Sequence, residues 1–192
     1  MEPKNFSSRV RLADFDPRLH YNSGAGKGKL VLWYLVKMGF FLTAFPFPSG
    51  LKASLLRLFG AKVGVGLVIK PRVNIHMPWK LEIGNHVWIG EEAFLLNFEK
   101  LSIGNNVCIS QRVFLCGGNH DYRSSAMPYR NGPITLHDGS WIGAGSFVSP
   151  NATVGTDTVV TACSVVVGRL EANGIYSGNP AVYKKQRWTD NG

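Results

Sequence analysis

Several features are scarce in this 192-residue chain, and each scarcity excludes a class of protein. The three cysteines, Cys108, Cys116 and Cys163, are odd in number and lack the spacing of a metal site, so neither a disulfide scaffold nor a structural zinc site is expected. Only 17% of the residues are charged, but 45% are hydrophobic and 11% aromatic, which excludes an acidic disordered chain. A reducing cytoplasm fits this cysteine usage best.

Negative charge is scarce in the N-terminal part of the chain. Residues 1–80 hold thirteen Lys and Arg against three Asp and Glu, a net charge of +10, whereas residues 81–192 carry −1. This asymmetry suggests either a polyanionic partner, such as nucleic acid, an anionic membrane surface or a phosphorylated substrate, or a solvated basic surface. The sequence shows no recognised nucleic-acid motif, so a nucleic-acid partner is not expected.

No apolar run is long enough to cross a membrane. The longest, Leu30 to Phe47, is interrupted by Lys37 and ended by Pro46 and Pro48, whereas a span needs about 20 apolar residues. A buried or interface-lying helix is therefore expected over this run.

A second helix is expected after Pro48 and ends at Gly60. It would place Leu51, Leu55, Leu58 and Phe59 on one face, with Lys52 off that face. Aromatic, apolar and basic residues together fit an interfacial membrane helix, and they equally fit a pair of helices that caps the next domain.

Helical periodicity is absent after Gly60, and a six-residue repeat of aliphatic residues replaces it. This period is typical of a parallel β-helix, in which three short strands make one coil and the aliphatic side chains stack inward. Glycines that follow these residues are interpreted as tight corners with unusual φ and ψ. A β-sandwich would instead show period-two alternation. The repeat positions are Val63, Ile69, Ile75, Ile83, Ile89, Leu95, Ile103, Ile109, Leu115, Leu136, Ile142, Val148, Val154, Val160 and Val166.

The repeat predicts an all-β chain that forms a parallel β-helix of about five coils. The spacing from Val63 to Ile83 to Ile103 is twenty, so the early coils carry a two-residue extension. The predicted organisation is a basic N-terminal tail with helices over residues 1–60, the β-helix over 61–171 and a C-terminal tail over 172–192.

The repeat is broken once, between Leu115 and Leu136, by a loop over residues 117–133. Long loops in compact repeats are usually functional or disordered. His120 lies at the start of this loop and is the candidate general base, because histidine can accept a proton near neutral pH. Asp121 is placed to orient or polarise its ring. The other histidines are His20, in the tail, and His76, His86 and His137, on coil surfaces. Because they do not share a common position, no metal site is expected.

Several stretches together resemble the left-handed β-helix O-acetyltransferases, a family that includes maltose, galactoside and nodulation acetyltransferases. They are the six-residue repeat, GGNHDY in the loop, DGSWIGAGSFVSPNATVG and YSGNPA. The stretches LLRLFGAKVG, PWKLEIGNHVWIGE and IGNNVCIS resemble the colanic acid biosynthesis acetyltransferases in particular. The resemblance implies that the coil is a left-handed parallel β-helix. It also implies a homotrimer with active sites between subunits, and acetyl-CoA as the donor.

The resemblance also assigns roles by position. His120 matches the histidine that takes the proton of a sugar hydroxyl as its oxygen attacks the thioester, without a covalent enzyme intermediate. Asn97 matches an acceptor-binding position. The family often has Thr-Lys where this chain has Val167 and Gly168, which leaves one phosphate contact to Arg169 or Lys184. The matching CoA positions are Trp141, Gly143, Ala144, Ala162, Val167, Gly168 and Lys185.

The implied function is O-acetylation of a sugar, free or lipid-linked, during exopolysaccharide or capsule synthesis. The enzyme would work in the cytoplasm, with residues 1–60 in peripheral contact with the anionic inner face of the membrane, and no metal is implied. Alternatives are acetyl transfer to a different small acceptor, a non-catalytic β-helix scaffold, and a β-helix metalloenzyme of the carbonic anhydrase type, which needs three converging histidines.

Overall fold

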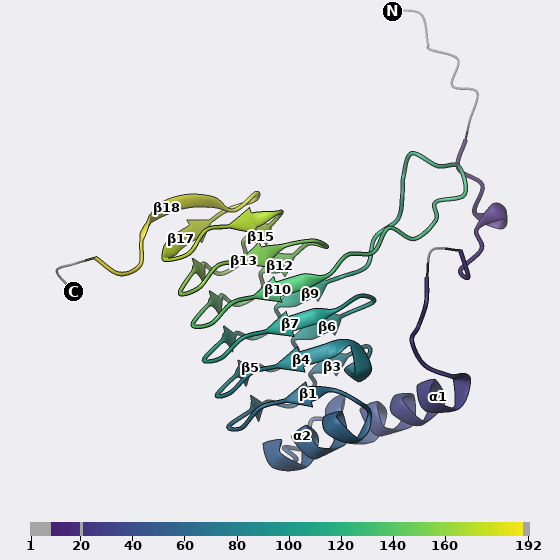
Figure 1. Ribbon diagram of the computed structural model, residues 1–192, viewed down its shortest axis with the longest axis horizontal. Coiled ribbons are helices and arrows are strands. Elements are labelled where there is room, and N and C mark those ends of the chain that lie inside the picture. The colour runs from purple at the N-terminus through teal and green to yellow at the C-terminus, as the bar shows by residue number, and fades with distance from the viewer. Residues whose placement is uncertain (1–8, 20, 190–192) are drawn as a thin grey trace, which may run out of the picture.

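The computed structural model describes residues 9–19 and 21–189 as a left-handed parallel β-helix with two helices against its first coil (Figure 1). Residues 1–8, His20 and residues 190–192, which belong to the predicted terminal tails, lie outside the described residues. Within the described ranges, no helix is long and apolar enough to cross a membrane.

Each side of the β-helix is one parallel sheet whose neighbouring strands come from successive coils. Sheet A comprises β1 (Lys62–Val63), β4 (Leu81–Ile83), β7 (Leu101–Ile103), β10 (Ile134–Leu136), β13 (Thr153–Val154) and β16 (Arg169–Leu170). Sheet B comprises β2 (Val68–Ile69), β5 (Trp88–Ile89), β8 (Cys108–Ile109), β11 (Trp141–Ile142), β14 (Val159–Val160), β17 (Gly174–Ser177) and the antiparallel β18 (Val182–Gln186). Sheet C comprises β3 (Asn74–Ile75), β6 (Phe94–Leu96), β9 (Phe114–Cys116), β12 (Phe147–Val148) and β15 (Val165–Val166). Five complete coils and a partial sixth confirm the predicted number.

The core is the column of inward aliphatic side chains. All predicted repeat positions are buried except Val63, which lies half-buried on the first strand. Strands pair so that each repeat residue lies beside its counterpart one coil away, as Ile83 does with Ile103. The two-residue extension lies at the corner between sheets C and A, where it adds Leu81 and Leu101 to the core. The stacking that the repeat predicted is therefore confirmed.

The glycines after the inward residues have a different cause from the one expected. Gly84 does not have a left-handed φ, but a Cβ at this position would lie 2.6 Å from the backbone carbonyl carbon of Gly104 on the next coil. The left-handed φ belongs to the residue two positions after the glycine. After Gly84 and Gly104 these residues are His86 and Asn106, which have side chains and φ values of 55° and 56°. The expectation of unusual φ and ψ at these glycines is wrong: glycine is needed because neighbouring backbones approach closely.

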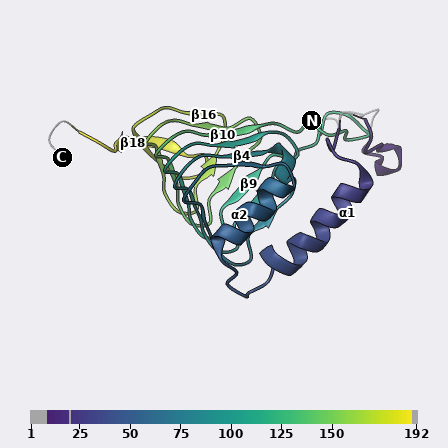
Figure 2. The same cartoon turned by 60° about the horizontal axis from the view of Figure 1, so that its bottom comes forward.

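Two N-terminal helices cover the open end of the first coil (Figure 2). Helix α1 (Lys27–Val36) continues into a π-helical turn, η2 (Lys37–Phe41), and α2 (Ser49–Leu58) follows. Trp33, Phe41 and Leu56 belong to the same buried cluster as the β-helix core. The Trp33 indole also donates hydrogen bonds of 3.1 Å to the carbonyl oxygens of Ile75 and His76. These helices therefore cap the core, as one of the two interpretations expected.

The buried face of α2 differs from the predicted one. Lys52, Ala53 and Leu56 face inward, whereas Leu58 is 78% exposed and Leu51 is exposed as well. Lys52 can lie inward because its ammonium donates a hydrogen bond to the Lys70 carbonyl oxygen at 3.1 Å. The prediction that Lys52 lies off the packed face is therefore wrong.

Candidate active site

The loop over residues 117–133 leaves the β-helix at the corner between sheets C and A. Its two arms run antiparallel: the Arg130 amide donates to the Asn119 carbonyl oxygen at 2.8 Å, and His120 and Tyr129 form a bridge pair. At its base, the Gly117 amide donates to the Leu96 carbonyl oxygen of the preceding coil at 2.8 Å. Backbone hydrogen bonds thus hold the position of His120.

The ring of His120 is oriented by a backbone carbonyl. Its Nδ1 lies 2.6 Å from the carbonyl oxygen of Met127, in the descending arm of the same loop. Because a carbonyl oxygen only accepts, this contact places the proton of the neutral ring on Nδ1 and leaves a lone pair on Nε2. Met127 has a left-handed φ of 44°, which is uncommon for a residue with a side chain and often marks a functional position.

Asp121 has a different environment from the one expected. Its Oδ1 accepts a hydrogen bond from the Arg123 amide at 3.1 Å, and its own amide donates to the Pro128 carbonyl oxygen at 2.9 Å. The contact that orients His120 comes from Met127, so Asp121 serves to shape the loop tip. A catalytic role for Asp121 stays a prediction without a contact to support it among the described hydrogen bonds.

Residues from the N-terminal segment pack around His120, and no motif or spacing in the sequence indicated them. The Phe15 ring lies 5.6 Å from the His120 ring and 5.2 Å from that of Tyr129, between ring centroids. Tyr21 contacts Tyr129 and Phe98, each at 5.3 Å. One side of the 117–133 loop is therefore lined by aromatic rings from segments about a hundred residues apart.

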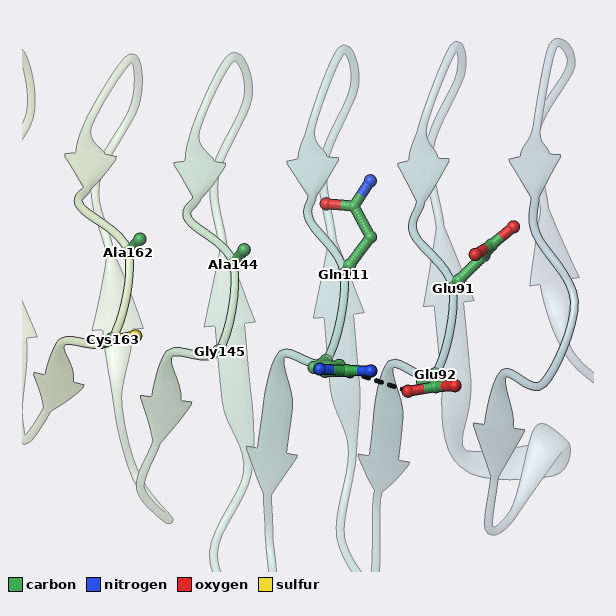
Figure 3. A pocket seen from close by; sticks show the side chains of 8 residues that line it. Glu91, Glu92, Gln111, Ala144, Gly145, Ala162 and Cys163 are labelled. Atoms are coloured by element: carbon green, nitrogen blue, oxygen red, sulfur yellow. Dashed lines mark hydrogen bonds and ion pairs between the residues drawn. The ribbon is translucent and has the colours of Figure 1, made fainter.

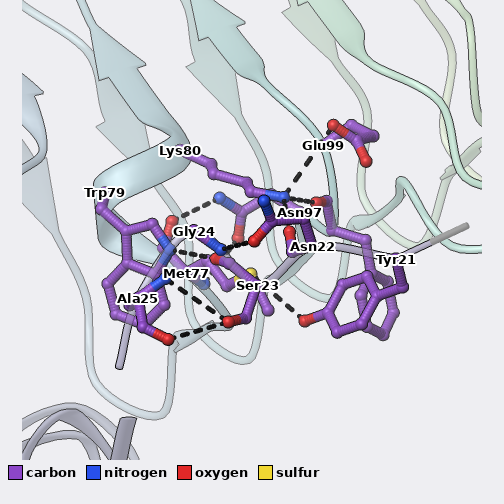
Figure 4. Close-up of polar contacts among 11 residues, drawn as sticks. Tyr21, Asn22, Ser23, Gly24, Ala25, Met77, Trp79, Lys80, Asn97 and Glu99 are labelled. Atoms are coloured by element: carbon purple, nitrogen blue, oxygen red, sulfur yellow. Dashed lines mark hydrogen bonds and ion pairs between the residues drawn. The ribbon is translucent and has the colours of Figure 1, made fainter. Parts of the chain in front are cut away.

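Hydrogen bonds anchor this N-terminal segment to the β-helix (Figure 4). The Trp79 indole donates to the Ser23 carbonyl oxygen at 2.6 Å, and the Lys80 ammonium donates to the Asn22 carbonyl oxygen at 2.7 Å. Both donors belong to η3 (Pro78–Lys80), the short 3-10 helix that makes the corner extension of the first coil. The basic N-terminal part is thus a structural neighbour of the candidate catalytic loop.

Asn97 lies at this corner with its side chain buried. Its Nδ2 donates to the Met77 carbonyl oxygen at 2.6 Å, and its Oδ1 accepts from the Met77 amide at 2.9 Å (Figure 4). Both ends of the amide are occupied in joining two coils. This geometry favours the stacking role, and binding of the acceptor by Asn97 stays a prediction.

His76 is half-buried, and its ring is tilted by 58° against that of Phe98 with 4.7 Å between ring centroids. Burial, together with the nearby Lys37 and Lys80 ammonium groups, lowers its pKa from 6.5 to about 4. It belongs to the coil surface, as expected, but the N-terminal part covers it. No three His, Cys, Asp or Glu side chains gather as a metal site in the part of the chain that the structure describes.

The lowered pKa of His76 makes folding stability depend on pH. Between pH 6.5 and 4 the unfolded chain binds a proton that the folded chain does not, so stability is complete above this window and falls as pH decreases through it. A His76→Phe variant keeps a ring against Phe98 but cannot titrate. Thermal unfolding should therefore lose less stability between pH 7 and 5 in this variant than in the wild type, and equal losses would contradict the assignment.

A groove of about 440 Å³ runs along the corner between sheets B and C (Figure 3). Its size lies in the range of ligand-binding clefts. Small residues on the two later coils leave it open: Ala144, Gly145, Ala162 and Cys163. Longer side chains on the two earlier coils close its end, namely Glu91, Glu92, Gln111 and Arg112, with the Arg112 guanidinium 2.8 Å from the Glu92 carboxylate.

Only some of the residues predicted to bind CoA line this groove. Ala144 and Ala162 line it, and Gly143 precedes Ala144 on the same corner. Trp141 lies on the outer face of sheet B, where it donates to the Ser110 hydroxyl at 2.9 Å and borders a second hollow of about 240 Å³. The remaining positions lie elsewhere: Val167 and Gly168 at the next corner between sheets C and A, and Lys185 on β18.

His120 and the groove occupy different corners of the β-helix. The loop that carries His120 leaves between sheets C and A, whereas the groove follows the corner between sheets B and C. Sheet C therefore lies between them within one chain.

The same fold and sequence features occur in known acetyltransferases. The chain is 38% identical over 164 residues to the colanic acid biosynthesis acetyltransferase WcaF of Escherichia coli K12, which covers 85% of this chain and 90% of that protein. It is 26% identical over 155 residues to an acetyltransferase of Saccharomyces cerevisiae, covering 76% of each chain. No family model matches the sequence.

Solved structures share the fold. A hexapeptide-repeat-containing acetyltransferase of Vibrio cholerae, in complex with acetyl coenzyme A, superimposes with a TM-score of 0.79 at 21% identity, over 88% of this chain and 94% of that one. A galactoside acetyltransferase in complex with coenzyme A gives a TM-score of 0.73 at 21% identity, over 83% and 81%. From the identity to WcaF over most of both chains, together with the shared β-helix, the chain belongs to the hexapeptide-repeat acetyltransferase family that includes WcaF.

Proposed function

We propose that the protein transfers the acetyl group of acetyl-CoA to a sugar hydroxyl of an exopolysaccharide or capsule precursor, with His120 as the general base. The observation that carries this proposal is the 2.6 Å contact between His120 Nδ1 and the Met127 carbonyl oxygen, because it leaves Nε2 free to accept a proton. The acetyl-CoA complex of the Vibrio cholerae protein supports the donor, and the name of WcaF supports a polysaccharide acceptor.

The proposed reaction is a direct transfer. The hydroxyl oxygen attacks the thioester carbonyl carbon as its proton passes to His120 Nε2. The tetrahedral intermediate then collapses, the carbon–sulfur bond breaks, and the CoA thiolate takes the proton from the imidazolium. Cys116 lies four residues before His120, but burial raises the pKa of its thiol, whose Sγ is 3.3 Å from the Gly118 carbonyl oxygen. A thiol held in its protonated form is a poor nucleophile, which favours direct transfer over an acetyl-enzyme.

A homotrimer would bring the two halves of the site together. Within one chain, His120 and the groove lie at different corners of the β-helix. Side-by-side packing of three parallel β-helices would set the His120 loop of one subunit against the groove of the next. The small side chains of Ala144 and Ala162 then leave room for the pantetheine arm.

Cys163 provides a test of the donor site that does not depend on activity. It is an exposed thiol in the groove, whereas Cys108 and Cys116 are half-buried. Acetyl-CoA at about ten times its Kd should slow maleimide labelling of Cys163 about tenfold, because mass action leaves about a tenth of the sites free. Mass spectrometry of labelled peptides measures this rate.

A matched control separates occlusion of the groove from a general effect of the ligand. A cysteine introduced at exposed Val182, on β18, should label at the same rate with and without acetyl-CoA. Equal labelling of Cys163 in both conditions would mean that the donor does not lie in this groove.

The acceptor is a sugar that is free, nucleotide-linked or carried on a lipid. We place the enzyme in the cytoplasm, with its N-terminal helices at the inner face of the membrane where lipid-linked sugars would be reached. Release of CoA from acetyl-CoA should rise with an acceptor from a panel of these three classes and stay at background without one. Failure of acetyl-CoA to bind would refute the proposed function.

A further inference from the structure

The N-terminal helices bury two lysines and leave several large apolar side chains exposed. Lys37 and Lys52 are buried, with exposures of 9% and 0%. Several large apolar side chains of α1 and η2 are 49–62% exposed: Val31, Leu32, Tyr34, Leu35 and Met38. A helix between a core and water normally places its lysines outside and its leucines inside.

Each of these two features has a cost in water. Lys52 keeps a single described hydrogen bond, to the Lys70 carbonyl oxygen, and Lys37 lies with its ammonium 5.4 Å from the centre of the Tyr34 ring. Burial lowers the pKa of both lysines. On α1, Leu35 lies three residues after Leu32 and four after Val31, so their exposed side chains share one side of the helix. Exposed apolar side chains grouped in this way mark an interaction site. An apolar environment outside α1 would remove the free-energy cost of exposing these apolar side chains to water.

The surroundings of this face are basic. Lys27 is exposed in the first turn of α1, whereas the ammonium of Lys29 lies 5.0 Å from the centre of the Trp79 ring. No Asp or Glu occurs anywhere between Asp16 and Glu82. The helices therefore carry no carboxylate that could pair with a basic partner. A twofold contact of this face with the same face of a second copy would bring lysines against lysines, whereas anionic lipid headgroups would complement them.

We propose that the outer face of α1 and η2, formed by Val31, Leu32, Tyr34, Leu35 and Met38, binds the surface of an anionic bilayer. The apolar side chains enter the boundary between headgroups and acyl chains, and Lys27 contacts the phosphates. Tyr34 suits this depth because its ring is apolar and its hydroxyl is polar.

This face is linked to the candidate active site. Helix α1 begins directly after the segment that Trp79 and Lys80 anchor, and Tyr21 of that segment contacts Tyr129 beside His120. The ribbon shows α1 and the 117–133 loop on the same side of the β-helix (Figures 1 and 2). Packed side chains therefore connect the outer face of α1 to the candidate active site. The binding itself does not depend on the proposed acetyl transfer.

Co-sedimentation of the full chain with vesicles tests the proposal. Wild-type protein should bind vesicles that contain phosphatidylglycerol, bind pure phosphatidylcholine vesicles less, and lose the difference at high salt. The double variant L32S/L35S should reduce binding to anionic vesicles at least about tenfold, because both side chains supply buried apolar area. The variant V182S changes a 50% exposed valine on β18, far along the chain from α1, and should bind as the wild type does.

A second variant separates charge from apolar contact. K27Q should weaken binding to anionic vesicles and flatten its salt dependence, without changing the weaker binding to phosphatidylcholine. Substitutions are preferable to removal of the helices, because removal would uncover the core beside Trp33 and Phe41. Equal unfolding temperatures of the variants show that the fold is retained.

Several outcomes would overturn the proposal. One is that wild-type protein does not bind anionic vesicles, and another is that L32S/L35S binds them unchanged. A third is that L32S/L35S dissociates an assembly in light scattering while vesicles never bind, which would assign the face to contact between copies. Acetyl transfer to a water-soluble acceptor should be equal in L32S/L35S and the wild type, so failure of membrane binding and failure of the proposed function are separately visible.

Discussion

Replacing His120 with alanine should lower kcat about 10²–10⁴-fold and leave a folded protein that still binds acetyl-CoA. The ring supplies the lone pair that accepts the hydroxyl proton, and its Nδ1 contact with the Met127 carbonyl oxygen sets the tautomer. The loop backbone is held by its own hydrogen bonds, including those of Arg130 and Gly132, so removal of the ring should not unfold it. Release of CoA with a competent acceptor measures the effect.

Two controls make this result specific to the base. His137 is an exposed histidine near β10, and His137→Ala should keep the wild-type rate. Protection of Cys163 by acetyl-CoA should persist in His120→Ala, because none of the residues of the same chain that line the groove belongs to the loop. Turnover of His120→Ala near the wild-type level would end the assignment of His120. An intact cellular phenotype with this variant would favour a scaffold.

The same assay decides the role of Asp121. In the structure its carboxylate accepts from the Arg123 amide, and the His120 ring is oriented by Met127. Asparagine can accept the same backbone hydrogen bond, so Asp121→Asn should lower kcat less than about tenfold. A loss as large as that of His120→Ala would show that the negative charge acts on the ring.

Gly84→Ala should destabilise the protein by about 2–3 kcal/mol and lower its thermal midpoint by about 5–10 °C. A Cβ at Gly84 would lie 2.6–2.8 Å from three backbone atoms of the next coil, at Gly104 and Asn105. Backbone atoms cannot turn away as a side-chain end can, so the stacked coils must separate locally. Because Gly84 has no left-handed φ, the effect comes from this contact.

A matched glycine should give the opposite sign. Gly50 lies in α2, where a Cβ would meet nothing within 4 Å, and alanine favours helix over glycine. Gly50→Ala should therefore leave the thermal midpoint unchanged or raise it by about 1–3 °C. If both substitutions shift the midpoint equally, the close approach of coils is not what requires glycine at Gly84.

The amino-acid sequence by itself determined the β-helix and the place where its regularity ends. Within a coil the inward residues recur every six positions, and each pairs with a counterpart one coil away, as Ile103 does with Ile83, so stacking of coils leaves a periodic signal. The break between Leu115 and Leu136 interrupts that signal and thereby located the loop of His120. The hand of the coil came only from the resemblance to a family.

Only the tertiary structure decided what surrounds His120 and which sides of the N-terminal helices are buried. Phe15, Tyr21 and Met127 meet His120 or its neighbours through folding of segments without a repeat, so no spacing announces these contacts. The helical pattern of apolar residues also predicted the wrong side for Lys52. A hydropathy pattern contains no information on the Lys70 carbonyl oxygen, which accepts a hydrogen bond from the buried ammonium. Contacts at a constant sequence separation can be read from the chain; contacts that depend on how distant segments pack require the fold.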